Sequence, residues 1–112
     1  MHEATLAENV LSIAVEAARQ NHADKIFRVG LRLGDMAGVE VEALRMAFDV
    51  LKKFSPAADA ELVIERVPVT AECNGCGKIF RLERYNFFCP ECDGVLVLRG
   101  GRELQVDFVD CE

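Results

Sequence analysis

The sequence predicts an α+β fold, in which two helices cover a small mixed three-stranded sheet and a metal-held subdomain is inserted. Three observations predict it: two amphipathic helical patterns, three alternating patterns of strand length, and two Cys-x-x-Cys pairs ahead of the last strand. With 112 residues, the chain can build one ordinary core and a small appendage. No single strand could bury an apolar face alone, so one sheet covered by both helices is the economical arrangement.

The two predicted helices cover about residues 4–21 and 39–53. Apolar residues of the first recur at spacings of three and four: Leu6, Val10, Ile13, Ala14 and Ala17. The second repeats the pattern with Val41, Leu44, Phe48 and Leu51. Met46 lies inside this second pattern, so we expect it to pack in the core.

The three predicted strands cover residues 26–33, 61–68 and 103–109. In the first, apolar residues alternate with more polar ones, which indicates a half-buried strand: Phe27, Val29, Leu31 and Leu33. The last alternates in the same way: Leu104, Val106 and Phe108. We therefore expect residues 1–69 and 101–112 to form one α/β domain, and residues 70–100 to form an inserted zinc ribbon.

Four cysteines form two Cys-x-x-Cys pairs, with twelve residues between the inner two. Two such turns, brought face to face by a hairpin, direct four thiolates at one point, as tetrahedral zinc requires. The alternative is two disulfides, but nothing in the chain resembles a secretory signal. The predicted ligands of one structural zinc ion are Cys73, Cys76, Cys89 and Cys92. The aromatic residues around them are expected to pack this small subdomain: Phe80, Tyr85, Phe87 and Phe88.

The composition argues against several kinds of partner. The formal net charge is -6, and the arginines near the cysteines are spread among acids, so a phosphate-binding surface for nucleic acid is not expected. No apolar run approaches the ~20 residues that cross a bilayer. No nucleophile and base stand together, and no phosphate-binding glycine loop is present, so we expect a soluble protein that is not an enzyme.

The first three residues, Met1-His2-Glu3, have the chemistry of a nickel or copper chelate. The His2 imidazole can reach its own amide nitrogen and the Met1 backbone amine, and the Glu3 carboxylate lies beside them. Nickel(II) and copper(II) favour tetragonal, nitrogen-rich sites of this kind. A solvated histidine with no metal is the alternative from spacing alone.

Taken together, these segments resemble the HypA/HybF nickel metallochaperones of hydrogenase maturation. The resemblance is carried by Met1-His2-Glu3 at the start of a helix, Leu31-Arg32-Leu33-Gly34, Ala47-Phe48 and the paired cysteines. It implies that His2, Glu3 and backbone nitrogens bind transported nickel, while the cysteines hold structural zinc. It also points to Glu40, although an acid at a helix start is favoured by the helix dipole without any metal.

The resemblance further implies a cytoplasmic carrier that delivers nickel for nickel-iron hydrogenase. Its expected partners are an accessory GTPase of the HypB type and the hydrogenase large-subunit precursor, and a homodimer remains open. Two rival functions are a rubredoxin-like iron protein and a zinc-ribbon interaction module. We expect His22 to cap the first helix or to be solvated, and Cys111 to be a bystander.

Overall fold

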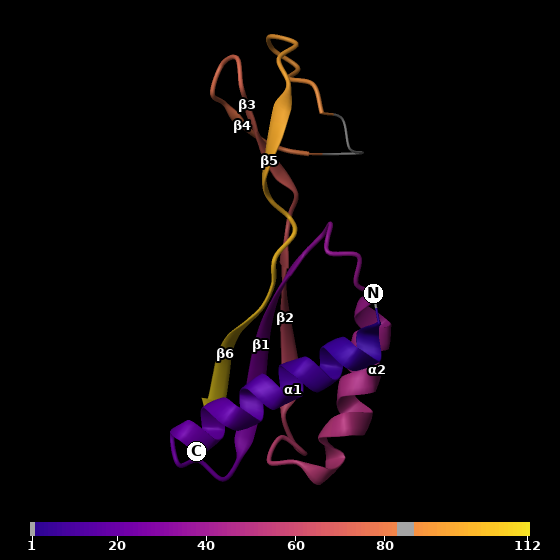
Figure 1. The fold of residues 1–112 in the computed structure, drawn as a ribbon, viewed down its shortest axis with the longest axis vertical. Coiled ribbons are helices and arrows are strands. Elements are labelled where there is room, and N and C mark those ends of the chain that lie inside the picture. Colours follow the sequence, from indigo (N-terminus) through magenta and orange to yellow (C-terminus); the bar gives the residue numbers. More distant parts are fainter. Residues whose placement is uncertain (1, 83–86) are drawn as a thin grey trace. The chain divides into compact units, whose positions relative to one another are not determined.

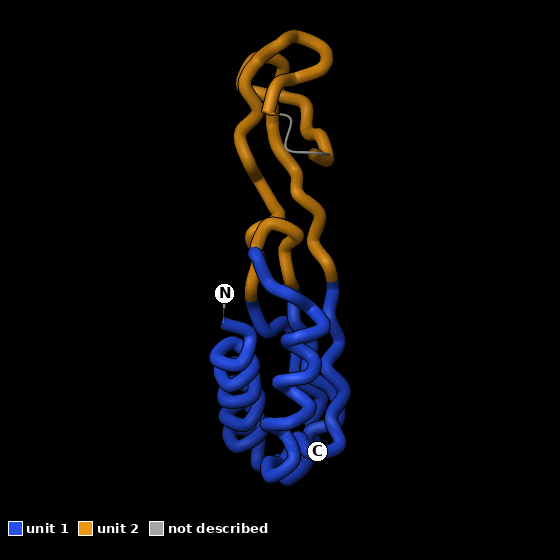
Figure 2. Tube along the Cα trace, turned by 90° about the vertical axis from the view of Figure 1, so that its right-hand side faces the viewer, with its two compact units in different colours: residues 1–32, 38–65, 105–112 blue, residues 33–37, 66–104 orange. Residues whose placement is uncertain are grey.

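The structure is a computed structural model that describes residues 2–82 and 87–112. The chain divides into two compact units (Figure 2). The first contains residues 1–32, 38–65 and 105–112, and the second contains residues 33–37 and 66–104. Among the described residues, no helix has the length and apolar character needed to cross a bilayer.

Two helices and a three-stranded sheet form the framework of the first unit (Figure 1). The helices are α1 (Glu3–Gln20) and α2 (Val41–Leu51), and α2 continues into a short 3-10 turn, η1 (Lys52–Phe54). The sheet has the order β2-β1-β6, with strands β1 (Ile26–Gly34), β2 (Glu61–Val67) and β6 (Leu104–Cys111). The predicted fold class is confirmed.

Backbone hydrogen bonds show that this sheet is mixed. Lys25 and Glu112 each donate an N–H to the carbonyl of the other, at 3.1 and 2.8 Å, as an antiparallel pair does. On the other side of β1 the bonded residues rise together along the chain, as in a parallel pair: Ile26 to Pro56 and Asp35 to Val67. The parallel strands β1 and β2 need a crossover, and α2 supplies it.

The core of this unit lies between the helices and the sheet. Both helices contribute the stripe that their apolar spacing predicts, with Phe48 of α2 fully buried. The buried members are Ala7, Val10, Ala14, Ala18, Ile26, Val29, Leu31, Leu44, Phe48, Ala57, Ala60 and Leu62.

Three residues expected in the core are exposed instead. Ile13 of α1 is 52% exposed and Met46 of α2 is 70% exposed, because each lies at the edge of a stripe that its neighbours already fill. In β1, Val29, Leu31 and Leu33 are buried as expected, but at the start of the strand Ile26 is buried in place of Phe27, which is 41% exposed. Lys25 lies over the Phe27 ring at 5.4 Å from its centroid, which covers part of that ring with a cation.

The second unit is built on a smaller antiparallel sheet in the order β4-β3-β5. Its strands are β3 (Thr70–Cys73), β4 (Ile79–Arg81) and β5 (Leu96–Gly100). The core is small: its buried members are Ala71, Cys73, Cys89 and Leu96, with Phe80, Leu82 and Leu98 packed against them. Of the aromatic residues expected to pack here, Phe80 does so, Phe87 and Phe88 are exposed, and Tyr85 lies outside the described residues.

Gly101 lies in the turn between β5 and β6. Its φ of +115° is a backbone conformation that side chains rarely adopt, and a Cβ there would lie 2.8 Å from Val69 Cα. Only glycine therefore fits the turn between β5 and β6.

Candidate metal centre and N-terminal groove

The structure brings the four cysteines of the second unit to one point. Their sulfurs all lie within 4.8 Å of one another, and the cysteines are free thiols. Cys73 and Cys92 sulfurs are 3.4 Å apart, and Cys76 and Cys89 sulfurs are 3.8 Å apart. A tetrahedral zinc with bonds of about 2.3 Å needs sulfurs separated by about 3.8 Å, whereas a disulfide needs about 2.05 Å. The geometry is therefore that of a metal site.

Backbone N–H groups point at these sulfurs and stabilise thiolates. The Cys76 N–H donates to Cys73 Sγ at 3.5 Å, and the Gly75 N–H donates to the same atom at 3.3 Å. The Cys76 N–H is the main cause that lowers the pKa of Cys73 to about 6. Hydrogen bonding to the Cys73 sulfur raises the pKa of Cys92 to about 12. The two N–H groups thus favour the thiolate form of Cys73, which is the form that binds a metal ion.

Glycine backbone encloses one side of the sulfur cluster. A Cβ at Gly94 would lie 2.9 Å from Cys73 Sγ and 3.1 Å from Cys92 Sγ. A Cβ at Gly75 would lie 3.1 Å from Cys92 Sγ. All three distances are shorter than ordinary van der Waals contact, so these turns can approach the sulfurs closely only because glycine has no side chain.

We expect Gly94→Ala to weaken metal retention because the added methyl pushes two sulfurs out of place. The loss of the bound metal ion to a chelator, followed by absorbance of the chelator complex, should be at least several-fold faster than in the wild type. Val95→Ala, which changes the exposed neighbouring residue, is the control and should keep the wild-type rate. Equal rates for Gly94→Ala and the wild type would contradict the crowded geometry.

An ion pair that the sequence pattern did not reveal joins the two cysteine turns. Lys78 Nζ follows the first pair and contacts a carboxylate oxygen of Glu91, which lies inside the second pair. Both side chains are about half exposed, so the pair contributes little to stability by itself. The ion pair therefore links the two turns without being a main source of their stability.

In the first unit, the N-terminal residues predicted to bind nickel lie at the start of α1. His2 is the N-cap residue: its carbonyl accepts the Leu6 N–H at 3.1 Å, but its side chain makes no capping hydrogen bond and is exposed. Glu3 Oε2 accepts the backbone N–H of Glu40 at 3.2 Å, which lowers the pKa of the Glu3 carboxyl. The N-terminus of α1 is thus tied to the N-cap of α2.

Among the described residues, the structure does not bring the side chains of the other predicted residues to a shared site. Glu40 is the exposed N-cap of α2, and its backbone, rather than its side chain, contacts Glu3. Met1 lies outside the described residues. His22 follows the end of α1 with a φ of 55°, and Cys111 of β6 packs against the core of the first unit. Within residues 2–82 and 87–112, the four cysteines are the only group of three or more histidine, cysteine or acidic side chains close enough to share a metal ion.

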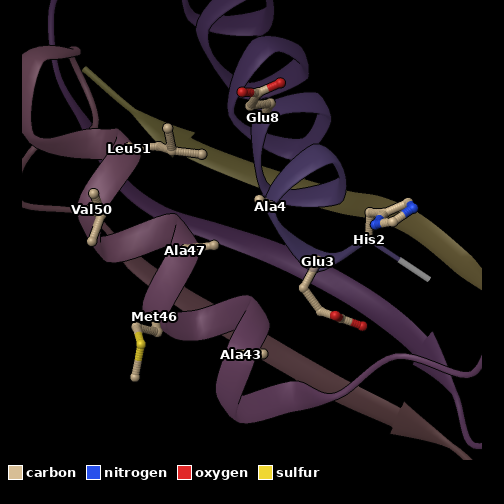
Figure 3. A pocket seen from close by; sticks show the side chains of 9 residues that line it. All are labelled: His2, Glu3, Ala4, Glu8, Ala43, Met46, Ala47, Val50 and Leu51. Atoms are coloured by element: carbon tan, nitrogen blue, oxygen red, sulfur yellow. The ribbon is translucent and has the colours of Figure 1, made fainter.

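A groove of about 600 Å³ opens between α1 and α2 beside His2 (Figure 3). Its lining is mostly apolar, and the acids lie on the α1 side. The lining residues are His2, Glu3, Ala4, Glu8, Ala43, Met46, Ala47, Val50 and Leu51. The groove was not predicted from the sequence, although Met46 and Val50 lie outside the helical spacing of Leu44, Phe48 and Leu51.

Four thiols converging on one point of a small three-stranded sheet define a metal-binding protein with a zinc-ribbon-like unit. Residues 1–111 match the family described as "Hydrogenase/urease nickel incorporation, metallochaperone, hypA". The chain therefore belongs to the HypA family of nickel metallochaperones, which are not enzymes.

Individual relatives agree over nearly the whole chain. The hydrogenase maturation factor HypA of Chloroflexus aurantiacus is 42% identical over 110 residues, covering 95% of each chain. That of Albidiferax ferrireducens is 38% identical over 113 residues, covering 100% of each. A solution structure of the Ni metallochaperone HypA from Helicobacter pylori shares the fold, with a TM-score of 0.70, 24% identity, and coverage of 99% of this chain and 97% of that one.

Proposed function

We propose that this chain binds nickel(II) through the His2 imidazole and neighbouring backbone nitrogens, with Glu3 and Glu40 beside them, and passes it to a nickel-iron hydrogenase precursor. The proposal rests mainly on one observation. In this member of the HypA family, the His2 imidazole is exposed and makes no capping hydrogen bond. His2 is the N-cap of α1, and the first N–H groups of a helix have no partner within the helix, so the His2 amide nitrogen is the proposed backbone ligand. Imidazole and amide nitrogen are ligands that nickel favours.

Several further parts of the proposal come from the family. The Met1 backbone amine completes the nitrogen ligands, and the accessory GTPase of the HypB type assists delivery in the cytoplasm. The four cysteines hold a structural zinc ion, for which free thiols and near-tetrahedral spacing are the support. Elemental analysis should find about one zinc and no iron per chain, and a red, iron-loaded protein would contradict this assignment.

We expect His2→Ala to lose nickel binding at the N-terminus, with affinity lowered at least tenfold in a calorimetric titration. The fold should be unchanged, because the His2 side chain caps nothing. The chain has one other histidine, His22, and His22→Asn is the matched control. Asparagine tolerates the positive φ of 55° at that position, so this control removes an imidazole without straining the backbone.

His22→Asn should bind nickel as the wild type does. An acetylated N-terminus should resemble His2→Ala, because acetylation removes the amine from the ligand set. Wild-type affinity in His2→Ala would overturn the proposed site.

A further inference from the structure

The exposed side of α2 carries an apolar stripe that the core of the first unit does not use. Met46 is 70% exposed, Val50 is 58% exposed, and Phe54, in the 3-10 turn that continues α2, is 100% exposed. Met46 and Val50 are four residues apart on α2 and lie along one side of that helix, and Phe54 ends the 3-10 turn that follows it. Single exposed apolar residues are ordinary on a protein surface, but a series of three beside a groove indicates a contact surface.

The groove described above adjoins this stripe, and Met46 and Val50 belong to both. It is open because the facing positions of the two helices carry small side chains, namely Ala4, Ala43 and Ala47. Such a groove between two helices has the form that receives the apolar face of a third helix, through residues at i, i+3, i+4 and i+7.

The charges along the groove limit what can occupy it. Apart from His2, its ionisable lining residues are the carboxylates Glu3 and Glu8, and Glu42 is exposed in the first turn of α2. A second copy of this chain, placed by twofold symmetry, would bring these acids together on a molecule of net charge -6. A membrane of anionic lipids would be repelled in the same way. A helix with lysine or arginine flanking its apolar face would complement both the groove and its rim.

We propose that the groove between α1 and α2, extended by the stripe from Met46 to Phe54, docks a cationic amphipathic helix of a partner protein. The occupant lies beside His2, and in that respect the inference rests on the proposed nickel site. A partner bound there approaches the exposed imidazole without displacing any residue of the core.

A fluorescently labelled model peptide tests this directly. Its leucines repeat at i, i+3, i+4 and i+7, and lysines fill the other positions; a second peptide carries glutamate in place of lysine. We expect the full-length chain to bind the lysine peptide by fluorescence anisotropy and to bind the glutamate peptide at least tenfold more weakly. Amide chemical-shift changes should concentrate at Ala43, Ala47 and Val50, and spare Phe108 on β6.

The decisive variant is Val50→Asp, which should weaken binding of the lysine peptide by about tenfold or more, as expected when an apolar anchor is lost. Ile13→Asp adds the same charge at another exposed aliphatic residue, on α1 and away from the groove, and should bind as the wild type does. Binding that both variants keep would show non-specific attraction to an acidic protein, and equal losses in both would show that the groove is not the binding site; either result would overturn the proposal. Shift changes outside the groove would do the same.

Two further measurements separate the alternatives. Sedimentation of the chain alone should show no dimer that depends on the groove. A dimer that Val50→Asp dissociates would instead assign the groove to a second copy of the chain. Nickel titration of Val50→Asp should match the wild type. If nickel binds at His2 but the peptide does not bind the groove, only the docking inference fails, whereas nickel binding that survives His2→Ala defeats the proposed function instead.

Discussion

Replacing Cys73 with serine is expected to abolish zinc binding and to unfold residues 66–104. Cys73 is buried, and its sulfur lies 3.4 Å from Cys92 Sγ and accepts two backbone N–H groups. The apolar cluster around the cysteines has four buried members among the described residues, which is too small a core to fold alone. Structural zinc contributes on the order of 10 kcal/mol or more in small domains of this kind, so losing one thiolate removes most of the stabilisation.

Zinc content and a two-dimensional amide spectrum together measure this effect. In Cys73→Ser, zinc should fall from about one per chain to near zero, and amides of β3, β4 and β5 should lose their dispersion. Signals from α1 and α2 should stay near their wild-type positions, because the first unit has a separate core.

Cys111→Ser is the matched control for this experiment. Cys111 lies in β6 and packs against the core of the first unit, so the variant changes the same atom at a residue outside the sulfur cluster. It should keep a full complement of zinc and an unchanged spectrum for β3 to β5. A zinc-free Cys73→Ser whose second unit stays folded would show that the hairpins, and not the metal, carry the fold.

Sequence patterns predicted the framework of the first unit because its signals are local. The buried stripe of α1 and α2 follows from apolar spacing, which a helix converts directly into one face. The convergence of the four cysteines could also be predicted, since a hairpin between two Cys-x-x-Cys turns is enough to bring their thiols together.

The remaining features depend on contacts between distant residues. Glu3 and the Glu40 N–H are 37 positions apart, and no periodicity predicts that one will accept a hydrogen bond from the other. The start of the alternation in β1 depends on which of Ile26 and Phe27 faces the helices, and both are apolar. Met46 was expected inside because it lies within the apolar pattern of the second helix, but Leu44 and Phe48 already occupy the inward positions of α2.

We expect Phe48→Ala to destabilise the first unit by about 3–5 kcal/mol, which is a large share of the roughly 5–15 kcal/mol that holds a typical domain folded. Phe48 has no solvent exposure and is the largest fully buried side chain of α2, packed among residues of both helices and the sheet. Truncating its ring leaves a cavity that the rigid neighbours cannot fill. The helical far-ultraviolet circular dichroism signal should unfold at a temperature lower by roughly 15 °C or more.

Phe54→Ala separates the effect of burial from the effect of removing a phenyl ring. Phe54 lies six residues further along, at the end of the 3-10 turn, and is 100% exposed. Its truncation leaves no cavity, so the free energy of unfolding should change by no more than about 0.5 kcal/mol. The same variant should weaken binding of the lysine peptide to the groove, since Phe54 ends the exposed stripe. A Phe54→Ala protein as destabilised as Phe48→Ala would mean that Phe54 packs into the fold, and the stripe would then not be a free docking surface.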